Sequence, residues 1–225
     1  MGATTPSAPW SGMDCRVVPW FCAEGKSSKP FSKTDQVLRG VAFIMIFNET
    51  KLKGAYVLEL EKKQDDRGYF ARAWCNKEAI DRGLDLQIVQ ANVSSNKRRG
   101  TLRGMHYQIA PYQEIKIVRC ARGAVYDVII DLRPASPTFR KWVGVELTPE
   151  NGRILYVPKG FAHGFQTLSD DAEVNYFVSQ YYSPEAERGV RFDDPAFNIQ
   201  WPPVERRIVS DKDQSWPYFT EEGAK

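Results

Sequence analysis

The runs of apolar residues along this chain are short, and turn-forming residues separate them. Beyond about residue 54 these runs are rich in Val, Ile and Tyr, and the clearest are AYVLEL (55–60), LQIVQANV (86–93), IKIVRCA (115–121), AVYDVIIDL (124–132), KWVGVEL (141–147), RILYVP (153–158) and AEVNYFVSQYY (172–182). Runs of this length and composition predict β-strands. Since the strands follow one another without alternating helical segments, the sequence predicts an all-β fold, an antiparallel sandwich or barrel.

Shorter signals predict the connections and the domain organisation. The segment CARGAVYDV predicts a tight hairpin around Arg122-Gly123. The segment NKEAIDRG predicts one short helix over residues 76–83, ending at Gly83. Residues 1–46 carry Pro, Ser and Lys without a steady period, and we interpret them as an N-terminal extension of uncertain order. The expected folded domain therefore covers residues 47–225.

The composition agrees with a folded domain and argues against two classes of partner. Hydrophobic residues make up 42% of the 225 residues, which is enough for a core. The formal net charge is only +3, so nucleic acid is not an expected partner. No run approaches the roughly 20 apolar residues that span a bilayer, so no membrane association is expected. Four cysteines are too few for a disulfide scaffold of this size, and we interpret the chain as cytoplasmic.

The chain has only two histidines, and both lie in glycine-containing, strand-like segments. The segment VPKGFAHGF (157–165) holds the second of them. Gly152, Pro158, Gly160 and His163 fall at the spacing of one of the two sequence motifs of the cupin superfamily. This part of the chain therefore resembles a cupin, a small jelly-roll barrel.

The segment LRGMHYQ (102–108) resembles the other cupin motif only in part. His106 follows Gly100 at the expected spacing, but Gln108 stands where a metal-binding cupin has a second histidine. Two histidines cannot supply the usual set of three His and one Glu, so no metal is expected, although a site of two His with Glu114 stays open. A lone histidine is more often a core residue, but two on facing strands of a ligand-holding barrel favour a functional site.

Several longer segments resemble one family closely. They are LRGMHYQ, KIVRCARGAVYDVIIDLRPASPTFRKWVGVEL, VPKGFAHGF, YYSPEAERGVRFDDPAFNIQWP and VSDKD, and the likeness runs from about residue 54 to residue 218. Their order and spacing resemble the dTDP-4-dehydrorhamnose 3,5-epimerase family. The resemblance implies an antiparallel jelly-roll (cupin) barrel with a few short helices, and a nucleotide-sugar substrate. It also implies a homodimer, and an epimerisation at C3 and C5 that needs no cofactor.

The resemblance also implies roles for four residues. Inversion next to a ketone requires a base on one face of the sugar ring, an acid on the other, and a stabiliser for the enolate oxygen. By resemblance, His106 is the base and Asp213 orients it, Lys116 stabilises the enolate and Tyr176 is the acid. From the residues alone, Asp213 would be a surface charge in a turn, Lys116 a solvated strand lysine and Tyr176 a barrel-wall aromatic.

A second set of residues is expected to bind the substrate, again by resemblance. Arginine suits the diphosphate because its planar fork matches phosphate oxygens. Amide side chains suit the nucleobase edge, and aromatic rings suit its faces. The expected residues are Arg103 and Arg67 for the diphosphate, Gln90 and Asn92 for the base edge, Tyr69 and Tyr181 for stacking, and His163 and Gln108 as further polar contacts. In the family, the segment RGYF that contains Arg67 and Tyr69 reaches the partner subunit's site.

Two positions depart from the family pattern, and other functions stay open. Arg72 stands where glutamate is frequent, which could alter nucleotide choice, and Phe177 stands where lysine is common, which could alter the placement of Tyr176. A variant that inverts only C3 or only C5 is therefore an alternative. A non-catalytic cupin that binds a nucleotide sugar or serves as a structural subunit is another, and a metal-dependent isomerase is disfavoured by Gln108.

Overall fold

The structure is a computed structural model that describes residues 45–84 and 86–220. The extension expected over residues 1–46 lies outside the described residues except for its last two positions, so this boundary stays a prediction. The elements in chain order are β1 (Ile46–Glu49), β2 (Tyr56–Glu59), β3 (Lys63–Asp65), β4 (Gly68–Phe70), α1 (Asn76–Ile80), β5 (Gln90–Asn96), β6 (Thr101–Gln108), β7 (Lys116–Arg122), β8 (Val125–Asp131), β9 (Trp142–Leu147), β10 (Ile154–Val157), β11 (Phe161–Thr167), β12 (Ala172–Val178), β13 (Glu187–Gly189), β14 (Ile208–Val209) and α2 (Asp211–Ser215).

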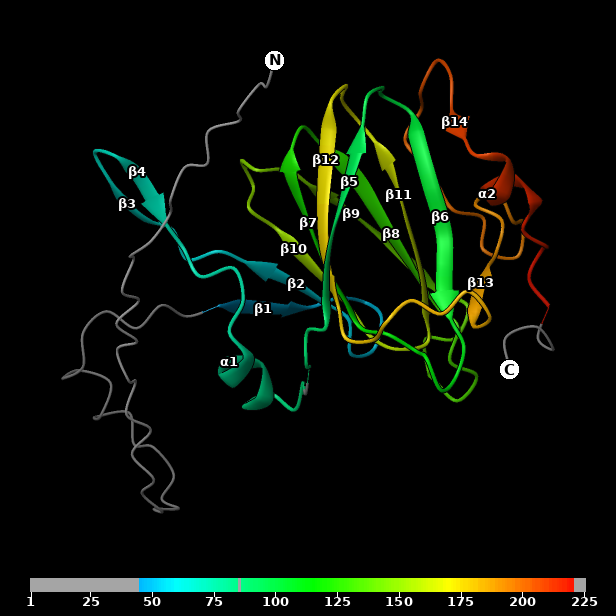
Figure 1. The fold of residues 1–225 in the computed structure, drawn as a ribbon, viewed down its shortest axis with the longest axis horizontal. Helices are drawn as coiled ribbons and strands as arrows, with labels where there is room; N and C mark the ends of the chain where they lie inside the picture. The colour runs from blue at the N-terminus through cyan, green and yellow to red at the C-terminus, as the bar shows by residue number, and fades with distance from the viewer. Residues whose placement is uncertain (1–44, 85, 221–225) are drawn as a thin grey trace, which may run out of the picture. The chain divides into compact units, whose positions relative to one another are not determined.

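Two six-stranded sheets form the body of the domain (Figure 1). The first has the order β1-β2-β10-β7-β12-β5, and the second has the order β13-β6-β11-β8-β9 with β14 beside β6. Only β14 runs parallel to its neighbour among the pairings in the described ranges. From β5 to β8 each successive strand joins the opposite sheet, as in a jelly roll. The predicted all-β antiparallel jelly-roll (cupin) fold with a few short helices is confirmed.

Apolar side chains from both sheets meet in one core. Val118 on β7 and Leu155 on β10 belong to the same buried cluster as Ile129 on β8 and Phe165 on β11. These side chains come from opposite sheets, so the two sheets face each other across this cluster. Burial of such residues stabilises the domain by about 25 cal/mol for each Å² of apolar surface removed from water.

The predicted hairpin around Arg122-Gly123 is wrong. The chain does reverse at Gly123, whose φ is +72°, but β7 pairs with β10 and β12, whereas β8 pairs with β11 and β9. The turn residues predict a reversal of direction but not the sheet that the next strand joins. Val118 and Val125 are both fully buried in the shared core, so the two strands lie opposite each other rather than side by side.

The other local predictions are largely confirmed, with shifted ends. Every predicted run contains a strand, although β5 begins only at Gln90 and β12 ends at Val178. The predicted helix ends at Ile80, and Gly83, with φ +74°, closes the turn that follows by donating to the Ile80 carbonyl at 2.8 Å. The two histidines face each other along neighbouring strands of one sheet, with His163 on β11 opposite His106 on β6. They do not lie on opposite sides of the barrel.

Candidate active site

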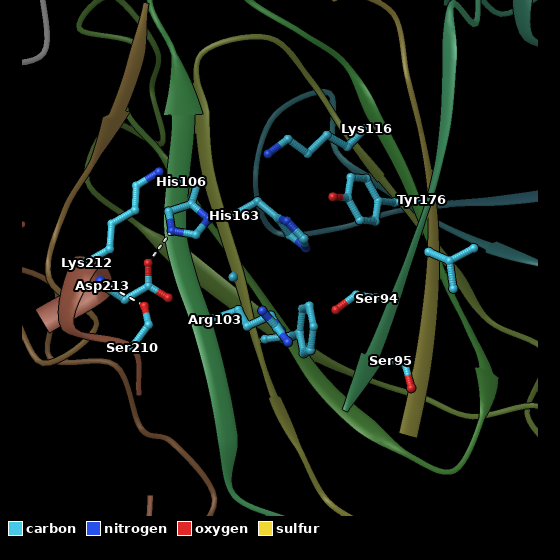
Figure 2. Close-up of a pocket in the computed structure, with 13 residues that line it drawn as sticks. Ser94, Ser95, Arg103, His106, Lys116, His163, Tyr176, Ser210, Lys212 and Asp213 are labelled. Atoms are coloured by element: carbon cyan, nitrogen blue, oxygen red, sulfur yellow. Dashed lines mark hydrogen bonds and ion pairs between the residues drawn. The ribbon is translucent and has the colours of Figure 1, made fainter. Parts of the chain in front are cut away.

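A cavity of about 560 Å³ opens between the two sheets and gathers six of the twelve predicted site residues (Figure 2). One wall carries Arg103 and His106 of β6, His163 of β11, and α2 with Asp213. The opposite wall carries Tyr176 of β12 and Lys116 of β7. A second cavity of about 390 Å³ shares His106, Lys116 and Tyr176 with the first. The sequence predicted these residues as one site, and the fold brings them together.

His106 is held by a carboxylate from the far end of the chain. Its Nε2 lies 2.6 Å from Oδ1 of Asp213, which is 107 residues away in sequence. Asp213 is in α2, whose first turn is capped by the Ser210 side chain accepting from the Asp213 backbone N–H at 3.1 Å. A carboxylate accepts hydrogen bonds, so this contact places a proton on Nε2 and leaves Nδ1 as the free basic atom.

The Asp213 carboxyl is buried and still ionised. Burial opposes its ionisation, but the hydrogen bond from His106, the electrostatic attraction of that side chain, the Gly104 N–H and Ser210 together outweigh the burial and lower the pKa of Asp213. The Gly104 N–H lies 3.3 Å from Oδ2. Gly104 has φ +129°, and an added Cβ would lie 2.5 Å from the Cα of Gly164 on the neighbouring strand. Only glycine fits this position.

Tyr176 lies across the cavity from His106. Figure 2 shows its hydroxyl pointing into the space between His106 and Lys116. Burial raises the pKa of Tyr176, the negative charge of Glu114 raises it further, and Arg103 acts in the opposite direction. The phenol therefore keeps its proton at neutral pH.

Lys116 is a buried lysine with a carboxylate partner. Its ammonium lies 3.0 Å from Oε1 of Glu114, and the two side chains are 10% and 13% exposed. Gln108 donates to the other oxygen of Glu114 at 2.9 Å. Glu114, left open above as a metal ligand, is thus an ion-pair partner here. Within residues 45–84 and 86–220, no group of three or more His, Cys, Asp or Glu side chains is arranged to hold a metal ion.

His163 has a carboxylate of its own. Its Nε2 lies 2.9 and 3.0 Å from the two oxygens of Asp127 on β8, and Asp127 is fully buried. The two histidines lie on the adjacent strands β6 and β11, and each has its own carboxylate partner. The sequence analysis missed Asp127, because an aspartate within the apolar run AVYDVIIDL carries no local signal. The sequence offers only a weak indication: a charged residue stands among apolar residues at a position that faces the core, where charge is rare.

Further residues at or beside the cavities support the predicted ones. Asn96 accepts from Nε of Arg103 at 2.8 Å and so directs that guanidinium. Lys212, beside Asp213 in α2, also lines the main cavity and pairs with both oxygens of Glu187 at 2.7 Å. The sequence analysis missed Asn96, Lys212 and Glu187, because each is defined by its neighbours in space.

Only some of the residues expected to bind the nucleotide line the two cavities. Gln90 and Asn92 line the second cavity, where Gln90 accepts from the Tyr182 backbone N–H at 3.1 Å. Tyr181 is 62% exposed and lines neither of these two cavities, whereas the neighbouring Tyr182 lines the second one. Gln108 lines it as well, but its amide nitrogen is already bonded within the protein, to the Tyr112 and Tyr181 carbonyls and to Glu114.

Arg67 and Tyr69 lie on a separate two-stranded hairpin formed by β3 and β4, away from the two large sheets in Figure 1. The Arg67 side chain is 89% exposed and pairs with Asp65 at the tip. Tyr69 and Phe70 are 49% and 62% exposed. None of these residues lines either of the two site cavities in the same subunit. The structure thus does not bring Arg67 and Tyr69 to the other predicted residues within one subunit.

The two departures from the family pattern lie outside the main cavity. Arg72 forms an ion pair with Glu78 of α1 at 2.9 Å. Phe177 packs with Leu58 and Ile117 on the outer face of the first sheet, because successive side chains of a strand point to opposite faces. It therefore points away from the cavity that Tyr176 lines. Among the described helices, none is long and apolar enough to cross a membrane.

Comparisons with known proteins identify the family of this chain. Residues 49–221 match the dTDP-4-dehydrorhamnose 3,5-epimerase family. The dTDP-4-dehydrorhamnose 3,5-epimerase of Sinorhizobium fredii is 42% identical over 177 residues, which cover 79% of this chain and 91% of that protein.

Solved structures of similar proteins share the fold. The Bacillus anthracis dTDP-4-dehydrorhamnose 3,5-epimerase with TDP and PPi bound is 43% identical, with a TM-score of 0.75 over 78% of this chain and 100% of that chain. The Legionella pneumophila epimerase in complex with dTDP-4-keto-L-rhamnose is 38% identical, with a TM-score of 0.74 over 78% of this chain and 93% of that chain. This chain belongs to the dTDP-4-dehydrorhamnose 3,5-epimerase family.

Proposed function

We propose that this protein is a cofactor-independent sugar-nucleotide epimerase that converts dTDP-4-dehydro-6-deoxy-D-glucose to dTDP-4-dehydro-L-rhamnose by inverting C3 and C5. The observation that carries the proposal is the placement of a carboxylate-bound histidine and a protonated tyrosine on opposite walls of one cavity. The relatives named above, one of them in complex with dTDP-4-keto-L-rhamnose, support this substrate.

The proposed reaction begins with proton abstraction next to the C4 ketone. Nδ1 of His106 takes the proton, the C–H electrons form the enolate, and the negative charge moves to the ketone oxygen. Asp213 stabilises the imidazolium that results, and the Lys116 ammonium stabilises the oxyanion. Tyr176 then delivers its phenolic proton to the opposite face of the same carbon, which completes the inversion. Exchange with solvent restores His106 and Tyr176 to their starting states.

The nucleotide part of the substrate is proposed to be bound by both subunits of a homodimer. Arg103 and the amides Gln90 and Asn92 come from one subunit. Arg67 and Tyr69 come from the exposed hairpin of the other, which accounts for their absence from the cavities of their own chain. Sedimentation at micromolar concentration is expected to give a dimer, and a stable monomer would contradict the shared site.

A cytoplasmic location is part of this proposal. Cys75 and Cys120 are free thiols, the form that a reducing compartment maintains.

A nucleotide-sugar-binding protein without catalysis is the alternative function. Simple binding has no use for a buried carboxylate on His106 or for a protonated phenol opposite it, so the geometry favours catalysis. The test is incubation with dTDP-4-keto-6-deoxyglucose in deuterated water, with C3 and C5 exchange followed by NMR. Wild type is expected to exchange, and His106→Ala to lose exchange by about 10²- to 10⁴-fold while it still binds dTDP. Binding without exchange in wild type would favour the non-catalytic alternative.

A further inference from the structure

Lys116 and Glu114 form a buried ion pair, and the proposed reaction uses the lysine but gives no role to the carboxylate of Glu114. Removing a carboxylate and an ammonium from water is costly, and the cost is offset only where the geometry is good and further hydrogen bonds satisfy the charges. The pair lies at 3.0 Å with both side chains nearly covered. An ammonium has three N–H donors, so one is directed at Glu114 and the others are free to face the cavity that Lys116 lines.

The Glu114 carboxylate is itself fixed in place. Its second oxygen accepts from the Gln108 amide nitrogen at 2.9 Å. Gln108 is 4% exposed, its nitrogen also donates to the Tyr181 carbonyl at 3.3 Å, and its oxygen accepts from the Ser183 N–H at 2.7 Å. Glu114 is therefore connected through Gln108 to the loop at 181–183. A carboxylate held at both oxygens can hold its lysine partner in one orientation.

Glu114 also acts on Tyr176. The titratable or charged side chains that line the two cavities with Tyr176 are Arg103, His106, Tyr107, Glu114, Lys116, His163, Tyr182, Glu187, Lys212 and Asp213. After burial, which contributes most, Glu114 is the group that raises the pKa of Tyr176, and Arg103 lowers it. An acid has to be protonated to deliver a proton, so this negative charge extends the pH range in which Tyr176 can act.

We propose that Glu114 is a positioning residue of this site, anchored by Gln108, that aims the Lys116 ammonium at the substrate ketone oxygen and places a negative charge in the cavity that Tyr176 also lines. The inference rests on the proposed epimerase function and extends it by a residue that acts through Lys116. A single carboxylate thereby serves both the enolate stabiliser and the acid, because it lies beside the first and within electrostatic reach of the second.

The test compares Glu114→Gln with Glu114→Asp. The glutamine variant keeps the shape and an oxygen that can accept from Gln108, but it leaves Lys116 without a charged partner. It is expected to lower kcat by about 10- to 100-fold, as for a small misplacement of a catalytic group. It is also expected to move the alkaline limb of the kcat/KM profile to lower pH, because a charge that raises the pKa of Tyr176 has been removed. The aspartate variant keeps the charge but shortens the reach, so kcat falls and the alkaline limb stays in place.

Two further variants complete the experiment. Glu146→Gln removes the same charge from an exposed position on β9 and is expected to leave both kcat and the pH profile unchanged. The double variant Lys116→Ala/Glu114→Gln is expected to be no slower than Lys116→Ala alone, since Glu114 acts on the enolate step through Lys116. A purely structural role would lower the folded fraction, which circular dichroism measures, without moving the alkaline limb.

The outcomes separate this inference from the proposed function. If wild type exchanges deuterium and Glu114→Gln keeps the wild-type alkaline limb, the inference is overturned and the epimerase stands. If the two substitutions at Lys116 and Glu114 slow the reaction additively, Glu114 does not work through Lys116, and the inference is again overturned. If wild type shows no exchange at all, the proposed function fails first.

Discussion

Replacing Asp213 by asparagine tests the His106 pair most directly, because the amide cannot reproduce the contacts of the carboxylate. Two N–H groups point at Asp213: that of His106 Nε2 at 2.6 Å and that of the Gly104 backbone at 3.3 Å. The carboxylate has two oxygens to accept them, whereas asparagine has one oxygen and an NH₂ group. Asp213 is 4% exposed, so water does not replace the missing acceptor.

The magnitude depends on which way the amide turns. If its oxygen accepts from His106, the imidazolium loses a charge-assisted hydrogen bond of about 1.5–3 kcal/mol, which corresponds to about 10- to 150-fold in rate. If its NH₂ faces His106 instead, Nε2 becomes the acceptor and the proton moves to Nδ1, the atom proposed as the base. A histidine held in the wrong tautomer by such a change can lose about 10⁴-fold. We therefore expect Asp213→Asn to slow exchange by about 10- to 10⁴-fold.

Deuterium exchange at C3 and C5 measures this loss, and dTDP binding measures whether the site is still formed. The matched control is Asp211→Asn, which removes a charge from the exposed first residue of the same helix and is expected to keep the wild-type rate. An Asp213→Asn protein that folds, binds dTDP and exchanges at a rate within a factor of about three of wild type would refute the role assigned to the pair.

The remaining predictions concern Tyr176 and a buried carboxylate far from the site. Tyr176→Phe keeps the His106 base but lacks the second-face acid, so it is expected to incorporate deuterium into recovered substrate while forming little inverted product; normal inversion would make Tyr176 a packing residue. Asp131 is fully buried, and although burial opposes its ionisation, hydrogen bonds from Arg133, Ser136 and Thr138 lower its pKa. A lowered pKa stabilises the fold above about pH 4, the unfolded value, and this stability is lost as the pH falls through the folded pKa. Asp131→Asn should therefore cost about 1–3 kcal/mol in urea unfolding at pH 7 and flatten the acid dependence, whereas an unchanged dependence would contradict it.

Most of the longer strands were predictable, but the short strands β1, β3, β4, β13 and β14 were not, and neither were the pairing partners of the strands. A run such as IKIVRCA shows that β7 is buried on both faces, yet nothing within it distinguishes a hairpin with β8 from a crossing to the other sheet. The sequence also does not predict which residues of two neighbouring strands stand opposite each other. His163 meets Asp127 across 36 residues, and nothing in the sequence around Asp127 marks it as the partner of that histidine.

The site residues that could be predicted from the sequence are mainly those that lie within the family's motifs. Asp213 would have been assigned to a surface turn from its own segment, although Ser210 three residues before it is a capping signal for the helix that buries it. Glu114 and Asn96 carried no such signal. Each acts on a side chain from a different part of the chain, so its role exists only in the folded structure.

The two-sheet architecture bears directly on the stereochemistry of the proposed reaction. A base without an opposing acid removes a proton and returns it to the same face, which exchanges hydrogen but leaves the configuration unchanged. Inversion requires a base on one side of the ring and an acid on the other, and the fold has to keep the distance between them constant. Here β6 and β12 belong to opposite sheets packed on a common core, and they hold His106 and Tyr176 on facing walls of the cavity. A substitution in that core, such as Phe165→Ala beneath the cavity, should therefore reduce inversion more than exchange, because it loosens the distance between the walls while leaving the His106–Asp213 pair intact. Equal losses of inversion and exchange would show that the spacing of the sheets does not control the outcome.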